Sequence, residues 1–115
     1  MPITLFQQYY HSADPGRQAE IDYVISKNCN NKYFDHVILF IDDATGPPPF
    51  ALRDHVVLIS LSRRLRFSDW IHQSFARCTS GVSLLANSDI MFDSSIRHLC
   101  TIDGHSCFAA ISRYE

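Results

Sequence analysis

Five short apolar segments recur along the chain, separated by longer stretches that mix polar and apolar residues. Each segment holds four or five residues and is apolar at nearly every position, which is typical of strands buried on both faces of a sheet. The segments are 3–6, 37–41, 56–59, 82–86 and 107–111. The pattern therefore predicts five strands.

The stretch after the first segment predicts an amphipathic helix. Asp14 is suited to cap a helix, and Pro15 to occupy its first turn. The apolar positions that recur at helical spacing, and so predict one buried face, are Ile21, Val24, Ile25 and Cys29. The polar residues around 28–31 predict that the helix frays there.

Two more helices are expected further along the chain. Ser68 can cap a helix over 69–78, with an inner side formed by the apolar side chains Trp70, Ile71 and Phe75. A short helix is expected from Ser94 or Ser95 to Leu99, followed by a turn at 103–104. Residues 44–50 include three consecutive prolines and predict an exposed, stiff loop.

Strands that alternate with helices predict an α/β fold with a mainly parallel sheet of about five strands and helices on both faces. The chain has 115 residues, of which 46% are hydrophobic, so we expect a single domain covering 1–115. Right-handed crossovers would bring the strand ends to one edge. The residues expected at this edge are Tyr9, Tyr10, Asp42, Asp43, Arg63, Arg66, Asn87 and Asp89.

Charge and hydropathy exclude several classes of partner. The formal net charge is −2 and the isoelectric point is near 6.3, so no basic field is expected to hold nucleic acid. No apolar run approaches the ~20 residues that span a bilayer, so no membrane partner is expected. The first residues lack the basic start and long apolar core of a signal peptide, so a cytoplasmic protein is expected.

The four cysteines, Cys29, Cys78, Cys100 and Cys107, form no Cys-x-x-Cys pair and no zinc-ligand spacing with the histidines. Cys29 and Cys78 fit the apolar faces of the predicted helices, which favours small buried thiols.

The strand 82–86 is followed at once by Asn87, Ser88 and Asp89, and this is the most informative stretch of the chain. Open α/β folds bind ligands at the carboxyl ends of their strands. An aromatic ring can stack on a base, arginine can pair with phosphate, and a carboxylate beside phosphate needs a divalent cation between them. The combination favours a nucleoside diphosphate bound through Mn²⁺ or Mg²⁺. The acid could instead merely cap the next turn, and the arginines around Arg63 could decorate a solvated loop.

Several segments, taken in order, resemble small glycosyltransferase-like proteins of the GT-A (nucleotide-diphospho-sugar transferase) fold. These segments span nearly the whole chain. They are 3–6, Arg17-x-x-Glu20 with a helix ending near Asn28, Arg66-Phe67-Ser68-Asp69, Ala86-Asn87-Ser88-Asp89-Ile90-x-Phe92-Asp93, and Ala110-Ile111-Ser112-Arg113-Tyr114.

The resemblance implies a minimal, Rossmann-like half of that fold which binds a metal-bound nucleotide-diphospho-sugar. Asp89 would hold the metal, and Asn87 stands where the family's metal-binding motif has its first Asp. The resemblance further implies substrate-binding roles for Tyr9 and Tyr10 near the base, for Arg66 at ribose or phosphate, and for Arg17 and Ser88.

Two departures from the family leave the function open between alternatives. Asn87 is neutral, and members of the family usually continue beyond the fifth strand with acceptor-binding elements and, in inverting enzymes, a catalytic base. Asp103 and His105 are candidates for that base by elimination only. The chain could therefore transfer a sugar to an unidentified acceptor hydroxyl. Alternatively, it could be a catalytically inactive module on the same fold that binds a nucleotide. It could also be a structural module that assembles into an oligomer, such as a homo-oligomer.

Overall fold

The computed structural model describes residues 3–42, 48, 53–61, 65–77, 81–88, 90–92 and 107–111. Its elements, in chain order, are β1 (Ile3–Tyr9), α1 (Pro15–Cys29), β2 (His36–Asp42), β3 (Val56–Leu61), α2 (Phe67–Arg77), β4 (Val82–Ala86) and β5 (Cys107–Ile111). No helix among these residues is both long enough and apolar enough to cross a bilayer.

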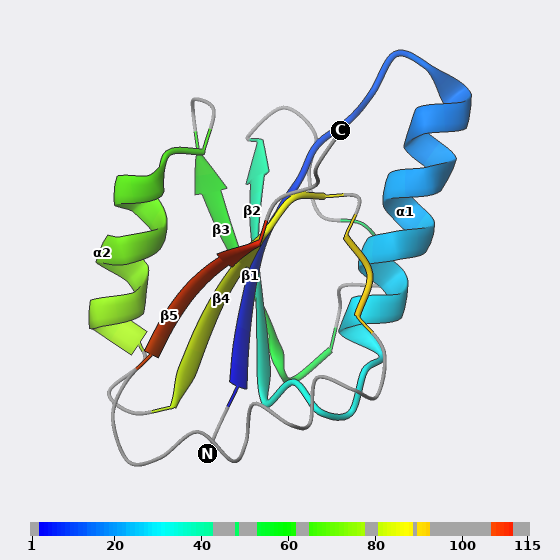
Figure 1. The fold of residues 1–115 in the computed structure, drawn as a ribbon. Coiled ribbons are helices and arrows are strands. Elements are labelled where there is room, and N and C mark those ends of the chain that lie inside the picture. The colour runs from blue at the N-terminus through cyan, green and yellow to red at the C-terminus, as the bar shows by residue number, and fades with distance from the viewer. Residues whose placement is uncertain are drawn as a thin grey trace.

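The strands form one sheet in the order β3-β2-β1-β4-β5, and every neighbouring pair is parallel. The chain therefore starts in the middle of the sheet, builds outward to β3, and then crosses back to β4 and β5. Helices α1 and α2 lie on opposite sides of the sheet (Figure 1). The predicted α/β fold with a parallel sheet is confirmed.

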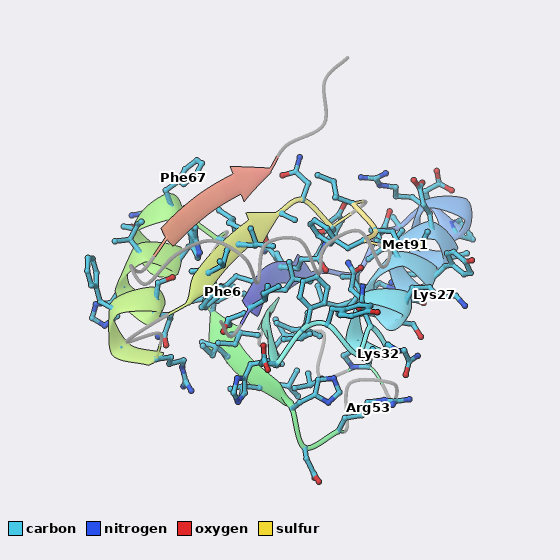
Figure 2. All side chains as sticks on the ribbon, turned by 60° about the horizontal axis from the view of Figure 1, so that its bottom comes forward. Phe6, Lys27, Lys32, Arg53, Phe67 and Met91 are labelled. Carbon is cyan, nitrogen blue, oxygen red and sulfur yellow. The ribbon has the colours of Figure 1, made fainter. Side chains whose placement is uncertain are left out.

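Alternation along each strand divides the core into two layers. On the α1 side, residues such as Leu5 and Leu39 pack against Ile21 and Ile25 of the helix. On the α2 side, the buried residues are Phe6, Ile38, Phe40 and Trp70. Phe6 lies inside the molecule, whereas Phe67 on α2 is 66% exposed (Figure 2).

Helix α1 begins as predicted, because the Asp14 side chain accepts a hydrogen bond of 3.0 Å from the backbone N–H of Gly16. The predicted apolar face is buried in full. The predicted fraying at 28–31 is wrong for the first two residues, since Asn28 and Cys29 are 0% and 1% exposed. Burial raises the pKa of the Cys29 thiol to about 11, which fits the prediction of a small buried thiol.

Helix α2 differs from the prediction in its start and in its inner side. It starts at Phe67, because the Asp69 carboxylate accepts a hydrogen bond of 2.9 Å from the backbone N–H of Arg66. Ser68 therefore lies in the first turn and is not the cap. The buried residues of α2 are Trp70 and Ser74, and Phe75 is 72% exposed.

A hydrogen-bonded cluster on β4 explains which side of α2 faces the sheet. The Trp70 Nε1–H donates to Ser83 Oγ at 2.9 Å, and the hydroxyls of Ser74 and Ser83 are 2.7 Å apart. Trp70 and Ser74 are one helical turn apart, so both reach the same strand residue.

Several predictions fall outside the described residues. They are the helix at 94–99, the turn at 103–104, the loop at 44–50 apart from residue 48, Asp43, Arg63, Cys78, Asp89 and Cys100.

Candidate functional site

The strand order creates a switch point between β1 and β4. The chain leaves β1 for α1 on one side of the sheet, whereas it enters β4 from α2 on the other side (Figure 1). In open α/β sheets, ligands bind outside the carboxyl ends of the strands at such a point. The last ladder pair joins Gln7 to Ala86, so the residues that follow on both strands line this edge.

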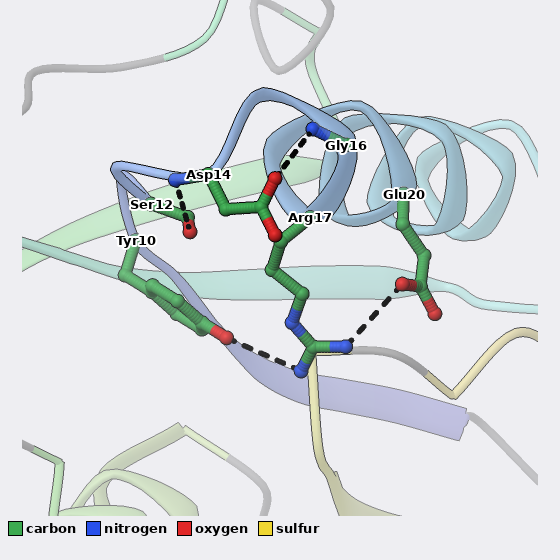
Figure 3. A network of polar contacts seen from close by, with 6 residues as sticks. All are labelled: Tyr10, Ser12, Asp14, Gly16, Arg17 and Glu20. Atoms are coloured by element: carbon green, nitrogen blue, oxygen red, sulfur yellow. Dashed lines mark hydrogen bonds and ion pairs between the residues drawn. The ribbon is translucent and has the colours of Figure 1, made fainter.

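Tyr10 and Arg17 meet at the end of β1. The Arg17 Nη2–H donates to the Tyr10 hydroxyl at 3.3 Å, and its Nη1–H donates to Glu20 Oε2 at 3.4 Å (Figure 3). Both contacts are long, and the Arg17–Glu20 pair is exposed to solvent. Exposed pairs of this kind contribute little to stability, so a phosphate group could compete for the guanidinium at little cost.

Tyr9 belongs to the core and not to the edge surface. Its side chain is 7% exposed, and its hydroxyl donates to Asp22 Oδ1 at 2.7 Å while accepting from Gln18 Nε2 at 3.2 Å. Burial, followed by the neighbouring Asp22 carboxylate, raises the pKa of Tyr9 to about 12. Its ring is therefore enclosed, and Tyr10, which is half-buried, is the tyrosine that a ligand can reach.

Asn87 and Ser88 follow β4 at the same edge. Asn87 is exposed. Ser88 is 8% exposed, and its hydroxyl donates to the backbone carbonyl of Gln8 at 2.5 Å. This hydrogen bond places Ser88 beside β1. Because the Ser88 hydroxyl already donates to Gln8, it cannot at the same time donate a hydrogen bond to a ligand. The predicted metal ligand Asp89 lies outside the described residues.

Arg66 stands apart from this group. It is exposed and immediately precedes α2, on the opposite side of the sheet from α1 (Figure 1). The structure thus brings Tyr10 to Arg17, and Ser88 to the end of β1. Arg66 lies in the connection that leads from the outer strand β3 to α2.

Two hollows are lined entirely by residues that the structure describes. One of about 430 Å³ adjoins the start of α1 and is lined by His11, Ser12, Ala13, Pro15, Gln18, Ala19 and Asp22. The other, of about 320 Å³, lies at the opposite, amino edge and is lined by Thr4, His36, Ile38, Val57 and Arg77. The first of these two is at the edge where the fold favours ligand binding. Its polar residues were missed by the sequence analysis, although Gln18 and Asp22 are one helical turn apart and follow the predicted cap.

The described residues contain no group of three or more His, Cys, Asp or Glu side chains placed to hold a metal ion. Of the two metal ligands predicted from the sequence, Asn87 is described, and its amide oxygen is a ligand type that Mg²⁺ and Mn²⁺ accept.

Comparisons with protein families, curated proteins and solved structures found no match to this chain.

Proposed function

We propose that the chain is a GT-A-like domain that binds a nucleotide-diphospho-sugar at the carboxyl edge between β1 and β4. The observation that carries the proposal is the parallel order β3-β2-β1-β4-β5, which places a switch point between these two strands. The order matches the first five strands of the doubly wound Rossmann order 3-2-1-4-5-6, in which the ligand also binds where the order reverses.

The residues at this edge suit the parts of such a ligand. Arg17 offers a planar guanidinium to the diphosphate, and the half-buried ring of Tyr10 lies beside it. Asn87, with the neighbouring Asp89, offers the oxygen ligands that Mn²⁺ or Mg²⁺ prefers. A bound cation would neutralise charge on the diphosphate and on the leaving group during transfer.

Thermal unfolding with and without ligand tests this proposal. A ligand that binds only the folded chain must raise the melting temperature. We expect a UDP-, GDP- or CDP-sugar at ten times its dissociation constant to raise it by several degrees, and to do so more strongly with Mn²⁺ present. Arg17→Gln and Asp89→Ala should each reduce the shift.

Arg77→Gln is the matched control, because Arg77 is also an exposed helix arginine but lies at the amino edge. It should leave the shift unchanged. The proposal fails if no nucleotide changes the melting temperature, or if Asp89→Ala and Arg17→Gln bind as the wild type does. A shift without turnover of the sugar nucleotide would mark a binding module that does not transfer sugar.

A structural role is the second candidate, and incomplete coverage of the sheet favours it. Val57, Ile59 and Leu61 on the outer strand β3 are only half-buried, and Phe67 on α2 is exposed. Apolar surface of this kind supports self-association. Sedimentation that shows a monomer at all concentrations would remove this candidate.

A further inference from the structure

Two fully buried amide side chains connect the candidate site to the core. Gln7 lies in β1 and Asn28 in the last turn of α1, and both are 0% exposed. The Asn28 Nδ2–H donates to Gln7 Oε1 at 2.8 Å, so the two amides form a direct link between the sheet and the helix. Buried amides are costly unless they are hydrogen-bonded, so their remaining partners indicate what this link does.

The remaining partners all belong to the segment that follows β4. Gln7 Nε2 donates to the carbonyls of Asn87 and Ile90 at 2.9 and 3.1 Å. Asn28 Nδ2 donates to the same Ile90 carbonyl at 2.9 Å, and Asn28 Oδ1 accepts from the Phe92 N–H at 2.9 Å. We call these five hydrogen bonds the Gln7–Asn28 clamp.

The clamp engages every donor of both amide groups. All four N–H donors of the two amides are engaged, and each amide oxygen accepts one bond. Reversing either amide would point an oxygen at carbonyl oxygens, so only one orientation of each is compatible with its partners. Such a network specifies one position for the backbone that it binds.

That backbone has little other support in the sheet. The last ladder pairs of β4 are at Ala86, so the chain loses its strand partners just before Asn87. Beyond the clamp, Ser88 is bonded to the Gln8 carbonyl and the Phe92 ring packs edge-on against Phe34 at 5.5 Å. Two further bonds act on this segment: the Ile90 N–H donates to the Asn87 carbonyl at 3.1 Å, and Asn31 Nδ2 donates to the Phe92 carbonyl at 3.3 Å. The clamp supplies the bonds to this segment that come from the side chains of β1 and α1.

We propose that Gln7 and Asn28 are positioning residues for the nucleotide site, an inference that rests on the proposed function. Neither side chain is accessible to a ligand. Gln7 acts through the carbonyls of Asn87 and Ile90, and Asn28 acts through the Ile90 carbonyl and the Phe92 N–H. Together they determine where Asn87 lies at the carboxyl edge. Side chains that orient metal-binding segments from behind commonly change metal affinity by about 10- to 100-fold when they are replaced.

The test compares two clamp variants with a control on the other side of the sheet. Gln7→Met keeps the length of the side chain and removes its hydrogen bonds, whereas Asn28→Asp keeps the acceptor for Phe92 and removes both donors. Ser74→Ala is the matched control, because Ser74 is also 0% exposed and hydrogen-bonded, but to Ser83 in the α2 layer. All three variants should melt below the wild type.

The dissociation constant for Mn²⁺ with UDP, GDP or CDP is then measured at a temperature where every variant is folded. We expect it to rise about 10- to 100-fold in the two clamp variants and to stay within about twofold in Ser74→Ala. If the wild type binds and the clamp variants bind equally well, the inference is overturned and the proposed function stands. If the wild type binds no nucleotide with Mn²⁺, the proposed function fails and the inference falls with it.

Amide hydrogen exchange provides a second measurement that needs no folded variant. The Phe92 amide should be protected in the wild type, because its N–H donates to buried Asn28. Where a clamp variant folds, exchange should accelerate in the peptide that contains 87–92 and not in β2. A wild-type Phe92 amide that exchanges as fast as an unstructured peptide would also overturn the inference.

Discussion

Tyr9 and Tyr10 are adjacent in the sequence and have different environments. Both were predicted near a base, yet Tyr9 is in the α1 layer with its hydroxyl on Asp22, while Tyr10 is half-buried beside Arg17. The difference depends on how far β1 extends, since the strand continues to Tyr9 and was predicted to end at residue 6. The polar side chains of Gln7 and Gln8 concealed this extension, because the hydrogen bonds that satisfy Gln7 join it to residues 21 to 83 positions later.

Tyr9 should make stability fall at high pH. The pKa of Tyr9 is about 12 in the folded chain, whereas an ordinary tyrosine has a pKa of 10.0. Between pH 10 and pH 12 the unfolded chain therefore loses the phenol proton while the folded chain keeps it. The stabilising effect is complete below pH 10 and disappears as the pH rises to about 12. Tyr9→Phe should lack this dependence, and at neutral pH it should cost about 1–2 kcal/mol for the lost hydrogen bonds.

Urea unfolding of both proteins from pH 8 to pH 11 measures the effect. Equal slopes of unfolding free energy against pH would contradict the assignment of Tyr9 to a buried, hydrogen-bonded position.

At the scale of the element, predictions succeeded where one apolar periodicity was present and failed where two competed. In α1 a single apolar face is buried, as predicted. In α2, Phe67, Ile71 and Phe75 form one stripe and Trp70 and Ser74 another, and the second faces the sheet. The choice between them depends on Ser83, which is reached only in the folded chain. No local pattern contains that information.

The connection into β4 makes a prediction about glycine. Gly81 has φ of 96°, a conformation that residues with a Cβ adopt only with strain, whereas Gly16 lies in α1. Gly81→Ala should therefore destabilise the chain by about 1–2 kcal/mol. Gly16→Ala is the matched control and should be neutral or stabilising by up to about 1 kcal/mol, because the added Cβ would meet only Asp14 Oδ1, at 3.5 Å.

Denaturant titration of the two variants gives both free energies. A neutral Gly81→Ala would show that this position tolerates a side chain, and would contradict the positive φ of Gly81.

At the scale of the whole molecule, the α/β class was predictable because fully apolar strands must be covered on both faces. The strand order was not, since several parallel orders satisfy right-handed crossovers equally well. The order matters for the proposed function, because it pairs β1 with β4 and so puts Tyr10 and Asn87, which follow these strands, at the same edge of the sheet. The sequence could predict that these residues share an edge, because parallel strands all end on the same side of the sheet. It could not predict that they lie at the switch point, because the strand order is decided by packing between residues far apart in the sequence.

The central claim is that a nucleoside diphosphate and its cation bind at the carboxyl edge between β1 and β4. Bound Mn²⁺ broadens the NMR signals of nearby amides, so titrating Mn²⁺ into the isotope-labelled chain with a nucleoside diphosphate locates the site directly. We predict that the amides of Tyr10, Arg17, Asn87 and Ser88 broaden first, while those of Thr4, His36 and Arg77 at the amino edge stay sharp. Selective broadening at the amino edge, or none at either edge while the nucleotide is bound, would contradict the account.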